Sequence, residues 1–223
     1  MDTVEEDSHV VFHGRCHDPI RITKDKLSII GQPGSKFIIS STASFGIAIS
    51  GRQVDIKNID LSGGKTGIVI YRGGSAEVSN SRITNAGSIG IEVTGSSYAH
   101  IEQTEIINSR RNGVVIRLSS SADIHDNKIR NNNKFGIVID ASAADIDGNL
   151  ISRSGRYGIL LRGGAKVRLG KDNASGKGNL FYNNSNGAIR CESNSVIEIA
   201  PEEIEFDYDL SDRCVLANLP DTE

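Results

Sequence analysis

The chain has 223 residues, a formal net charge of −3, 37% apolar and 24% charged residues, a balance typical of a folded protein. It has 24 glycines but only 5% aromatic residues and no tryptophan, so its core must come from Ile, Val and Ala, which favour strands. This composition excludes a collagen-like chain and a disulfide-dense scaffold, and no apolar run is long enough to span a membrane.

Charge is divided unevenly along the chain. Residues 1–7 hold four acids and no base, and residues 198–223 hold nine acids and one base, Arg213. The body between them, residues 8–197, therefore carries a net charge of about +9. A basic body between acidic ends indicates a polyanionic partner, or serves solubility alone.

Residues 1–45 precede the regular part of the sequence, and we predict that they form N-terminal starting coils. Residues 46–199 then repeat a glycine followed by apolar residues, at Gly46, Gly67, Gly90, Gly113, Gly136, Gly158 and Gly187. Two more apolar positions follow in most periods, such as Ile101 and Ile106, and Asn85, Asn108 and Asn131 share one turn position. Three short strands per period, with like residues in rows, predict an all-β stack of coils of about 22 residues.

With these rows and its opening stretch from Val10 to Gly31, the chain resembles the right-handed parallel β-helix superfamily of pectate-lyase-like proteins, which includes carbohydrate-binding proteins and sugar hydrolases. The resemblance implies a single-stranded, right-handed parallel β-helix and a carbohydrate partner. It leaves the activity open, because the superfamily includes lyases, hydrolases, epimerases, phage tailspikes and binding modules. In pectate lyases, the sheet equivalent to the first strand lines the sugar groove.

Residues 200–223 break the repeat with Pro201 and an acidic run, and we predict that they form a C-terminal cap on the last coil. Cys191 in that coil and Cys214 in the cap are candidates for a disulfide if the protein is secreted or periplasmic, as the resemblance implies. Three reduced thiols in a cytosolic protein are the alternative.

Alternation along the first strand predicts an outward row that is almost wholly aliphatic: Ala48, Val69, Glu92, Val115, Val138, Leu160 and Ile189. An exposed aliphatic row needs a cover, which we expect to be a second subunit or the tail with Phe206, Tyr208, Leu210, Val215 and Leu216. The residues before the repeat glycine, Phe135 and Tyr157, are predicted to stack inward.

The second strand gathers acids around two histidines. One outward row is predicted as Asp55, Glu77, His100, Asp123, Asp145 and Lys166, and the other as Lys57, Ser79, Glu102, His125, Asp147 and Arg168. Three interpretations are open. The face is solvated and the histidines relieve carboxylate repulsion, or it binds Ca²⁺ through oxygen ligands or zinc through mixed ligands. The third is acid–base catalysis on a sugar by Glu102, Asp123, His125 and Asp145.

Basic residues dominate the third strand and the turn after it. A polyuronate or sulfated chain is the predicted ligand of this face, because arginine binds carboxylates and sulfates in bidentate fashion. The predicted contact residues are Arg110, Arg111, Arg117, Lys134, Asp140, Arg153, Arg156 and Arg162. Ordinary surface charge is the alternative. Nucleic acid is disfavoured as a ligand, because the basic residues do not alternate with exposed aromatic residues on which nucleotide bases could stack.

The sequence therefore favours an exported module that binds a polymeric, anionic carbohydrate, with Ca²⁺ or no cofactor, no nucleic acid and no membrane span. One alternative is a polysaccharide lyase or hydrolase that uses the second-strand acids or the Arg117, Asp140 and Arg162 row. The other is a structural or adhesin scaffold that forms homo-oligomers through the aliphatic row.

Overall fold

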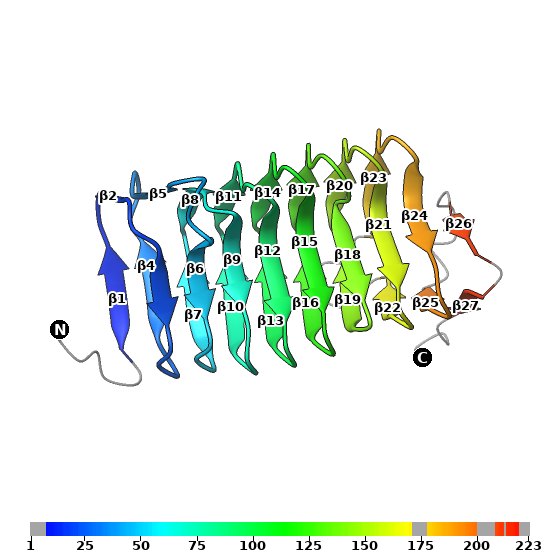
Figure 1. Ribbon diagram of the computed structural model, residues 1–223, viewed down its shortest axis with the longest axis horizontal. Coiled ribbons are helices and arrows are strands. Elements are labelled where there is room, and N and C mark those ends of the chain that lie inside the picture. Colours follow the sequence, from blue (N-terminus) through cyan, green and yellow to red (C-terminus); the bar gives the residue numbers. More distant parts are fainter. Residues whose placement is uncertain (1–7, 171–177, 200–207, 212, 219–223) are drawn as a thin grey trace.

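The computed structural model describes residues 8–170, 178–199, 208–211 and 213–218, and these form strands and turns without a helix. The strands stack along one axis into an elongated right-handed β-helix of about eight turns (Figure 1). The coils are roughly 23 residues long, close to the predicted 22. The predicted fold class is confirmed.

Each coil up to β24 contributes one strand to each of three parallel sheets, and the last described strands, β25, β26 and β27, extend two of these sheets. Sheet A contains β1 (His9–Phe12), β4 (Ser28–Gly31), β7 (Val54–Lys57), β10 (Ser75–Ser79), β13 (Tyr98–Glu102), β16 (Ser121–His125), β19 (Ala143–Asp147), β22 (Lys166–Leu169), β25 (Val196–Ile199) and β27 (Val215–Asn218). Sheet B contains β2 (Arg15–Cys16), β5 (Lys36–Ile39), β8 (Asp60–Gly63), β11 (Arg82–Thr84), β14 (Glu105–Ile107), β17 (Lys128–Arg130), β20 (Leu150–Ser152) and β23 (Leu180–Tyr182). Sheet C contains β3 (Ile20–Ile22), β6 (Phe45–Ile49), β9 (Thr66–Ile70), β12 (Ile89–Thr94), β15 (Asn112–Arg117), β18 (Ile137–Asp140), β21 (Tyr157–Arg162), β24 (Gly187–Cys191) and β26 (Tyr208–Leu210).

The core is a column of aliphatic side chains between the three sheets. Ile101 pairs with Ile124 and Ile124 with Ile146 in successive coils, and each is at most 1% exposed. A coil cannot bury its inner face alone, because the coils before and after it supply the covering side chains. Cohesion of the molecule therefore depends on contacts between neighbouring coils.

The repeat glycines are required by close packing at the corner where sheet C begins. A Cβ on Gly90 would lie 2.5 Å from Cγ2 of Ile106 and 2.7 Å from the carbonyl oxygen of Gly113. Neither neighbour has room to retreat in a close-packed interior. The glycine row thus marks the point at which the chain passes against the isoleucines of sheet B.

Asparagines hold the turns on both sides of sheet B. Asn85, Asn108 and Asn131 adopt left-handed backbone conformations with φ of 55°, 59° and 56°, as their shared turn position predicts. A second row escaped the sequence analysis: buried Asn149 accepts a hydrogen bond from the backbone N–H of Asn127 at 3.0 Å and donates to the carbonyl of Ile124 at 2.7 Å. This buried row satisfies backbone groups that the bend between sheets A and B leaves unpaired.

The described part of the C-terminal segment continues the stack. β26 pairs with β24 in sheet C, and β27 pairs with β25 in sheet A, so both end strands add to existing sheets. The prediction that Tyr208, Leu210, Val215 and Leu216 lie across the aliphatic row is therefore wrong, and Phe206 lies outside the described residues. Cys191 and Cys214 form the predicted disulfide, which ties this segment to the last full coil.

Two predicted registers near the C-terminal end are wrong. Asp145 pairs with Arg168 rather than Lys166, because a turn with two left-handed glycines, Gly163 and Gly164, takes up two more residues than predicted. Leu160 pairs with Arg190, and Ile189 faces the core with no exposed surface. In the outward row of sheet C, Leu160 is therefore followed by Arg190 and then by Asp209 of β26.

Candidate functional site

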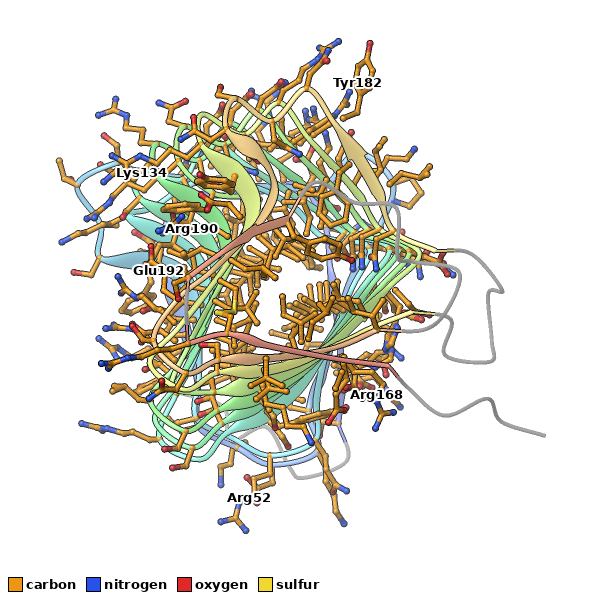
Figure 2. All side chains as sticks on the ribbon, turned by 90° about the vertical axis from the view of Figure 1, so that its right-hand side faces the viewer. Arg52, Lys134, Arg168, Tyr182, Arg190 and Glu192 are labelled. Atoms are coloured by element: carbon orange, nitrogen blue, oxygen red, sulfur yellow. A yellow bond between two sulfur atoms is a disulfide. The ribbon has the colours of Figure 1, made fainter. Side chains whose placement is uncertain are left out.

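A cleft of about 550 Å³ lies over the C-terminal half of sheet C. β15, β18, β21 and β24, with the residues just before them, form its walls. It is lined by Arg111, Asn112, Lys134, Phe135, Val138, Arg156, Tyr157, Leu160, Arg162, Asn186, Arg190 and Glu192. Viewed along the long axis, Lys134, Arg190 and Glu192 lie on one side of the molecule, and Arg168 of sheet A lies on another (Figure 2).

Three basic residues form one rim of the cleft. The backbone N–H of Lys134 donates to the carbonyl of Arg111 at 2.6 Å, and that of Arg156 donates to the carbonyl of Lys134 at 2.7 Å. These bonds place the three residues in successive coils, about 4.8 Å apart. We call Arg111, Lys134 and Arg156 the cation row. Within the described part of the chain, no carboxylate forms an ion pair with any of them.

Aromatic side chains lie beside the cation row. Phe135 and Tyr157 are half-buried and line the cleft, so the prediction that they stack inward is wrong. The glycines that follow them, Gly136 and Gly158, take the inward position against sheet B, which leaves the preceding residue facing outward. The guanidinium of Arg156 lies over the Phe135 ring, with Cζ 5.8 Å from the centroid.

Val138 and Leu160 of the aliphatic row form the floor of the cleft, and this part of the row is not exposed as predicted. Val115, Val138 and Leu160 are 5 to 6% exposed and pack against Ile89 and Phe135. Their own neighbours provide the cover that the sequence analysis assigned to a second subunit or to the tail. Most of the apolar surface that suggested a homo-oligomer is therefore buried within the chain, and Val69 is half-buried.

An ion-pair network closes the C-terminal end of the cleft. Arg190 pairs with Glu192 at 3.1 Å and with Asp209 on β26, and the hydroxyl of Tyr157 also donates to Asp209. The hydrogen bonds from Arg190 and Tyr157 lower the pKa of Asp209, and donation to that carboxylate raises the pKa of Tyr157. These contacts favour a charged Asp209 and a neutral Tyr157, and they join the last coil to β26.

Half of the predicted ligand residues meet in the cleft. Arg111, Lys134, Arg156 and Arg162 line it. Arg117 instead pairs with Glu92 at 2.7 Å, and Asp140 holds Arg162 at 2.7 Å.

The two remaining predicted residues, Arg110 and Arg153, are exposed and lie outside the cleft lining. Sequence reasoning missed Arg190, because its coil was aligned on Gly187 instead of Ala188. A 30-residue spacing for this one coil would have placed Arg190 after Leu160 in the outward row.

The predicted catalytic group lies on another sheet. Glu102, Asp123, His125 and Asp145 occupy the outer face of sheet A, half-buried, with Asp123 beside Asp145 and Glu102 beside His125 in the predicted register. Asp145 forms an ion pair with Arg168 at 3.8 Å. Acid–base catalysis by these residues stays a prediction, and the cleft of sheet C does not include them.

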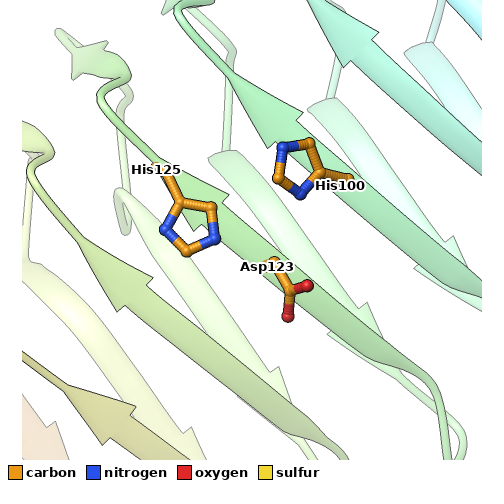
Figure 3. A group of neighbouring side chains, drawn as sticks. All are labelled: His100, Asp123 and His125. Atoms are coloured by element: carbon orange, nitrogen blue, oxygen red, sulfur yellow. The ribbon is translucent and has the colours of Figure 1, made fainter. Parts of the chain in front are cut away.

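Part of this face has the composition of a metal site. His100, Asp123 and His125 come from adjacent strands β13 and β16 and lie side by side on the outer face (Figure 3). One ligand atom from each lies within 4.8 Å of the others. Two imidazoles and a carboxylate suit zinc better than Ca²⁺, which prefers six to eight oxygens.

Comparison with known proteins identifies the fold. Residues 34–174 match the family model described as the right-handed β-helix region. Tailspike protein 2 of the Escherichia coli O157:H7 bacteriophage CAB120 is similar in structure, with a TM-score of 0.65 and 12% identity over 95% of this chain and 38% of the tailspike. Pectate lyase Pel9A gives a TM-score of 0.47 and 10% identity over 94% of this chain and 68% of the lyase.

The chain spans well under half the length of the tailspike, and identities this low show the fold alone. A comparison with curated protein sequences gives no match. Among the described residues, no helix is long and apolar enough to cross a membrane.

Proposed function

This chain belongs to the family of right-handed β-helix proteins, and from that premise we propose that it binds a polymeric, anionic carbohydrate along the cleft of sheet C. The observation that carries the proposal is the cation row. Arg111, Lys134 and Arg156 stack one per coil, and no carboxylate of the described residues pairs with them.

A row of like charges costs stability unless a ligand supplies the opposite charge. Two unit charges about 5 Å apart repel by roughly 1 to 3 kcal/mol near a protein surface. A uronate carboxylate or a sulfate would convert this repulsion into attraction, and each arginine can hold such a group with two parallel hydrogen bonds. The cation row is therefore best explained as a binding surface for an anion.

The geometry favours a polymer over a small molecule. The cation row, the aromatic pair and the aliphatic floor all run parallel to the long axis of the molecule. An extended chain in this direction would present successive anionic groups to successive coils. Phe135 and Tyr157 would pack against the apolar faces of sugar rings, while the basic residues fix their carboxylates.

We also propose an oxidising compartment, secreted or periplasmic, as the site of action. The disulfide between Cys191 and Cys214 supports this location, because such bonds persist where thiols are not kept reduced.

A lyase or hydrolase is the second candidate, and one observation favours it. Asp123 and Asp145 are paired in adjacent coils, and neighbouring parallel strands place such side chains near the carboxylate separation of retaining glycosidases, about 5 Å. Chemistry there would act on a polymer bound to sheet A, a different face from the cleft.

One experiment tests both candidates. The protein is titrated with pectate, alginate and a sulfated glycan, and with neutral dextran as control, with and without Ca²⁺. Calorimetry measures affinity, and light scattering measures polymer mass. We expect binding to the anionic polymers alone, weakening as salt is added, with polymer mass unchanged.

Each other outcome has a definite meaning. A falling polymer mass that Asp123→Asn with Asp145→Asn abolishes would make the protein an enzyme acting through sheet A. Equal binding of dextran, or no binding of any anionic polymer at low salt, would overturn the proposed function.

A further inference from the structure

We propose that His100, Asp123 and His125 form a site for one divalent transition-metal ion of the zinc type on the outer face of sheet A. The site is separate from the cleft of sheet C and does not depend on the proposed carbohydrate. Its ligand atoms already lie within 4.8 Å of one another, and the three residues are half-buried.

The backbone alone brings the three ligands together. His100 on β13 and Asp123 on β16 are partners in the parallel register, so they stack in adjacent coils. His125 lies two residues after Asp123 and therefore faces the same side of the sheet. The two imidazole rings have centroids 5.3 Å apart. We expect rotations of the side chains to bring all three groups to bonding distance of one ion.

A second layer of contacts orients two of the three ligands. Asp147, whose side chain is 4% exposed, pairs with Nδ1 of His125. That contact leaves Nε2 as the metal-binding nitrogen, the arrangement found when a carboxylate supports a histidine ligand. The hydroxyl of Tyr98 donates to Oδ2 of Asp123 at 2.5 Å, so Asp123 can present its other oxygen to the ion.

A carboxylate completes the surroundings of His100. Oε2 of Glu102 lies 3.6 Å from Nε2 of His100. Two neutral imidazoles and a carboxylate would take part of the ion's charge, and Glu102 balances the remainder. Three protein ligands of mixed nitrogen and oxygen type, with one position left over, match the coordination of zinc rather than Ca²⁺.

The bound ion would join neighbouring coils, because its ligands belong to β13 and β16. A ligand that binds only the folded chain raises the melting temperature with its concentration. We therefore expect zinc at 100 times its Kd to raise the melting temperature by roughly 5 to 10 °C.

The chain has only five histidines, which permits a sharp test. The other three lie close together near the N-terminus beside a cysteine, so they are removed first to give a background variant: His9→Gln, His13→Gln, His17→Gln and Cys16→Ser. Zinc binding to the background variant is measured by calorimetry, and Co²⁺ binding by its visible absorption. We expect one ion per chain, and Ca²⁺ at equal concentration should not displace Co²⁺.

Substitutions in this background separate ligands from positioning residues. We expect His100→Gln and His125→Gln each to weaken zinc binding more than tenfold while the far-ultraviolet circular dichroism stays unchanged. Asp147→Asn should weaken binding by roughly tenfold and keep the Co²⁺ spectrum, because it acts through His125. A background variant that binds no zinc, zinc affinity unaffected by His125→Gln, or displacement of Co²⁺ by equal Ca²⁺ would each overturn the proposal.

Discussion

The outer face of sheet A and the cleft of sheet C treat charge in opposite ways. On sheet A, opposite charges meet one coil apart: Lys57 pairs with Glu77 at 3.0 Å, and Lys166 pairs with Glu198 at 2.6 Å. At the rim of the cleft, Arg111, Lys134 and Arg156 follow one another without a carboxylate partner in the described residues. Carboxylates also neighbour one another on sheet A, where Asp123 lies beside Asp145, but Arg168 of the next coil pairs with Asp145 there.

This difference distinguishes charges that stabilise the stack of coils from charges that a ligand of opposite sign would have to neutralise. Cross-strand pairs of opposite sign stabilise a sheet, and like pairs destabilise it. The repeat makes the distinction easy to see, because each residue has a neighbour at an equivalent position in the next coil. A row of one sign is therefore a stronger indication of a ligand than the total charge of the chain.

Reversing two charges of the cation row should have the largest effect. For Lys134→Glu with Arg156→Glu, we expect affinity for the anionic polymer to fall at least about 100-fold, because a charged hydrogen bond contributes roughly 1.5 to 3 kcal/mol. Calorimetry measures the loss. The matched control, Lys166→Glu with Arg168→Glu on sheet A, changes net charge equally and should alter affinity less than about threefold. Equal losses in both variants would mean that net charge, and not the row, determines binding.

Removing the aromatic side chain beside the row should have the next largest effect. Phe135→Ala deletes a cleft surface and also uncovers Val138 and Leu160. We expect about tenfold weaker polymer binding and a loss of about 2 kcal/mol in the free energy of unfolding. Phe12→Ala is the control, because Phe12 stacks on Phe37 away from the cleft. Phe12→Ala should lower the free energy of unfolding and leave affinity for the polymer unchanged. An equal drop in affinity in both variants would contradict a direct contact between Phe135 and the polymer.

Removing one of the carboxylates that pair with Arg190 should make the cleft more attractive to an anion. Asp209→Asn releases Arg190 from an ion pair, so we expect polymer affinity to rise roughly two- to fivefold. Because hydrogen bonds from Arg190 and Tyr157 lower the pKa of Asp209, its stabilising effect is present above pH of about 4 and is lost as pH falls further. The melting temperatures of the two proteins should therefore differ at pH 7 and converge as pH falls below about 4. A difference that does not shrink at all as pH falls from 4 to 2 would argue against this ion pair as its source.

The smallest effect should come from a substitution on the outer face of sheet A. Burial favours a neutral Glu77, but the hydrogen bond and charge of Lys57 outweigh it and lower the pKa of Glu77. The pair therefore stabilises the fold above pH of about 4.3 and loses its effect below that value. We expect Lys57→Met to change the free energy of unfolding by less than about 1 kcal/mol and polymer affinity not at all. Urea titrations at pH 7 and pH 3 measure the change in the free energy of unfolding. A larger loss at pH 3 than at pH 7 would contradict the predicted pH dependence of the Lys57–Glu77 pair.

The middle coils could be predicted residue by residue. Their spacing stays at 22 or 23 residues, so the register of Ile101, Ile124 and Ile146, and of His100 between Glu77 and Asp123, follows from counting. The pairing of Lys166 could not be found in this way. A shift of two residues keeps the same side chains inward, so alternation does not detect it.

The cleft was harder to predict than the stack. Its basic rim was visible in the sequence, because Arg111, Lys134 and Arg156 recur at coil spacing. Phe135 was assigned to the core, because the sequence pattern does not show that Gly136 occupies the inward position against sheet B. The sequence pattern also misses Arg190 as a cleft residue. One longer coil shifts the predicted register by a single residue, and such a shift assigns every side chain of the strand to the opposite face.

The uniform rise of the coils has a consequence for how such a protein can evolve. Duplication of one coil would insert a glycine, a buried asparagine and a set of isoleucines between identical neighbours, so the core would need no other change. Each added coil would lengthen the rim by one basic residue, about 4.8 Å. The length of ligand recognised could thus grow or shrink in whole steps through recombination, independently of the sequence elsewhere in the chain.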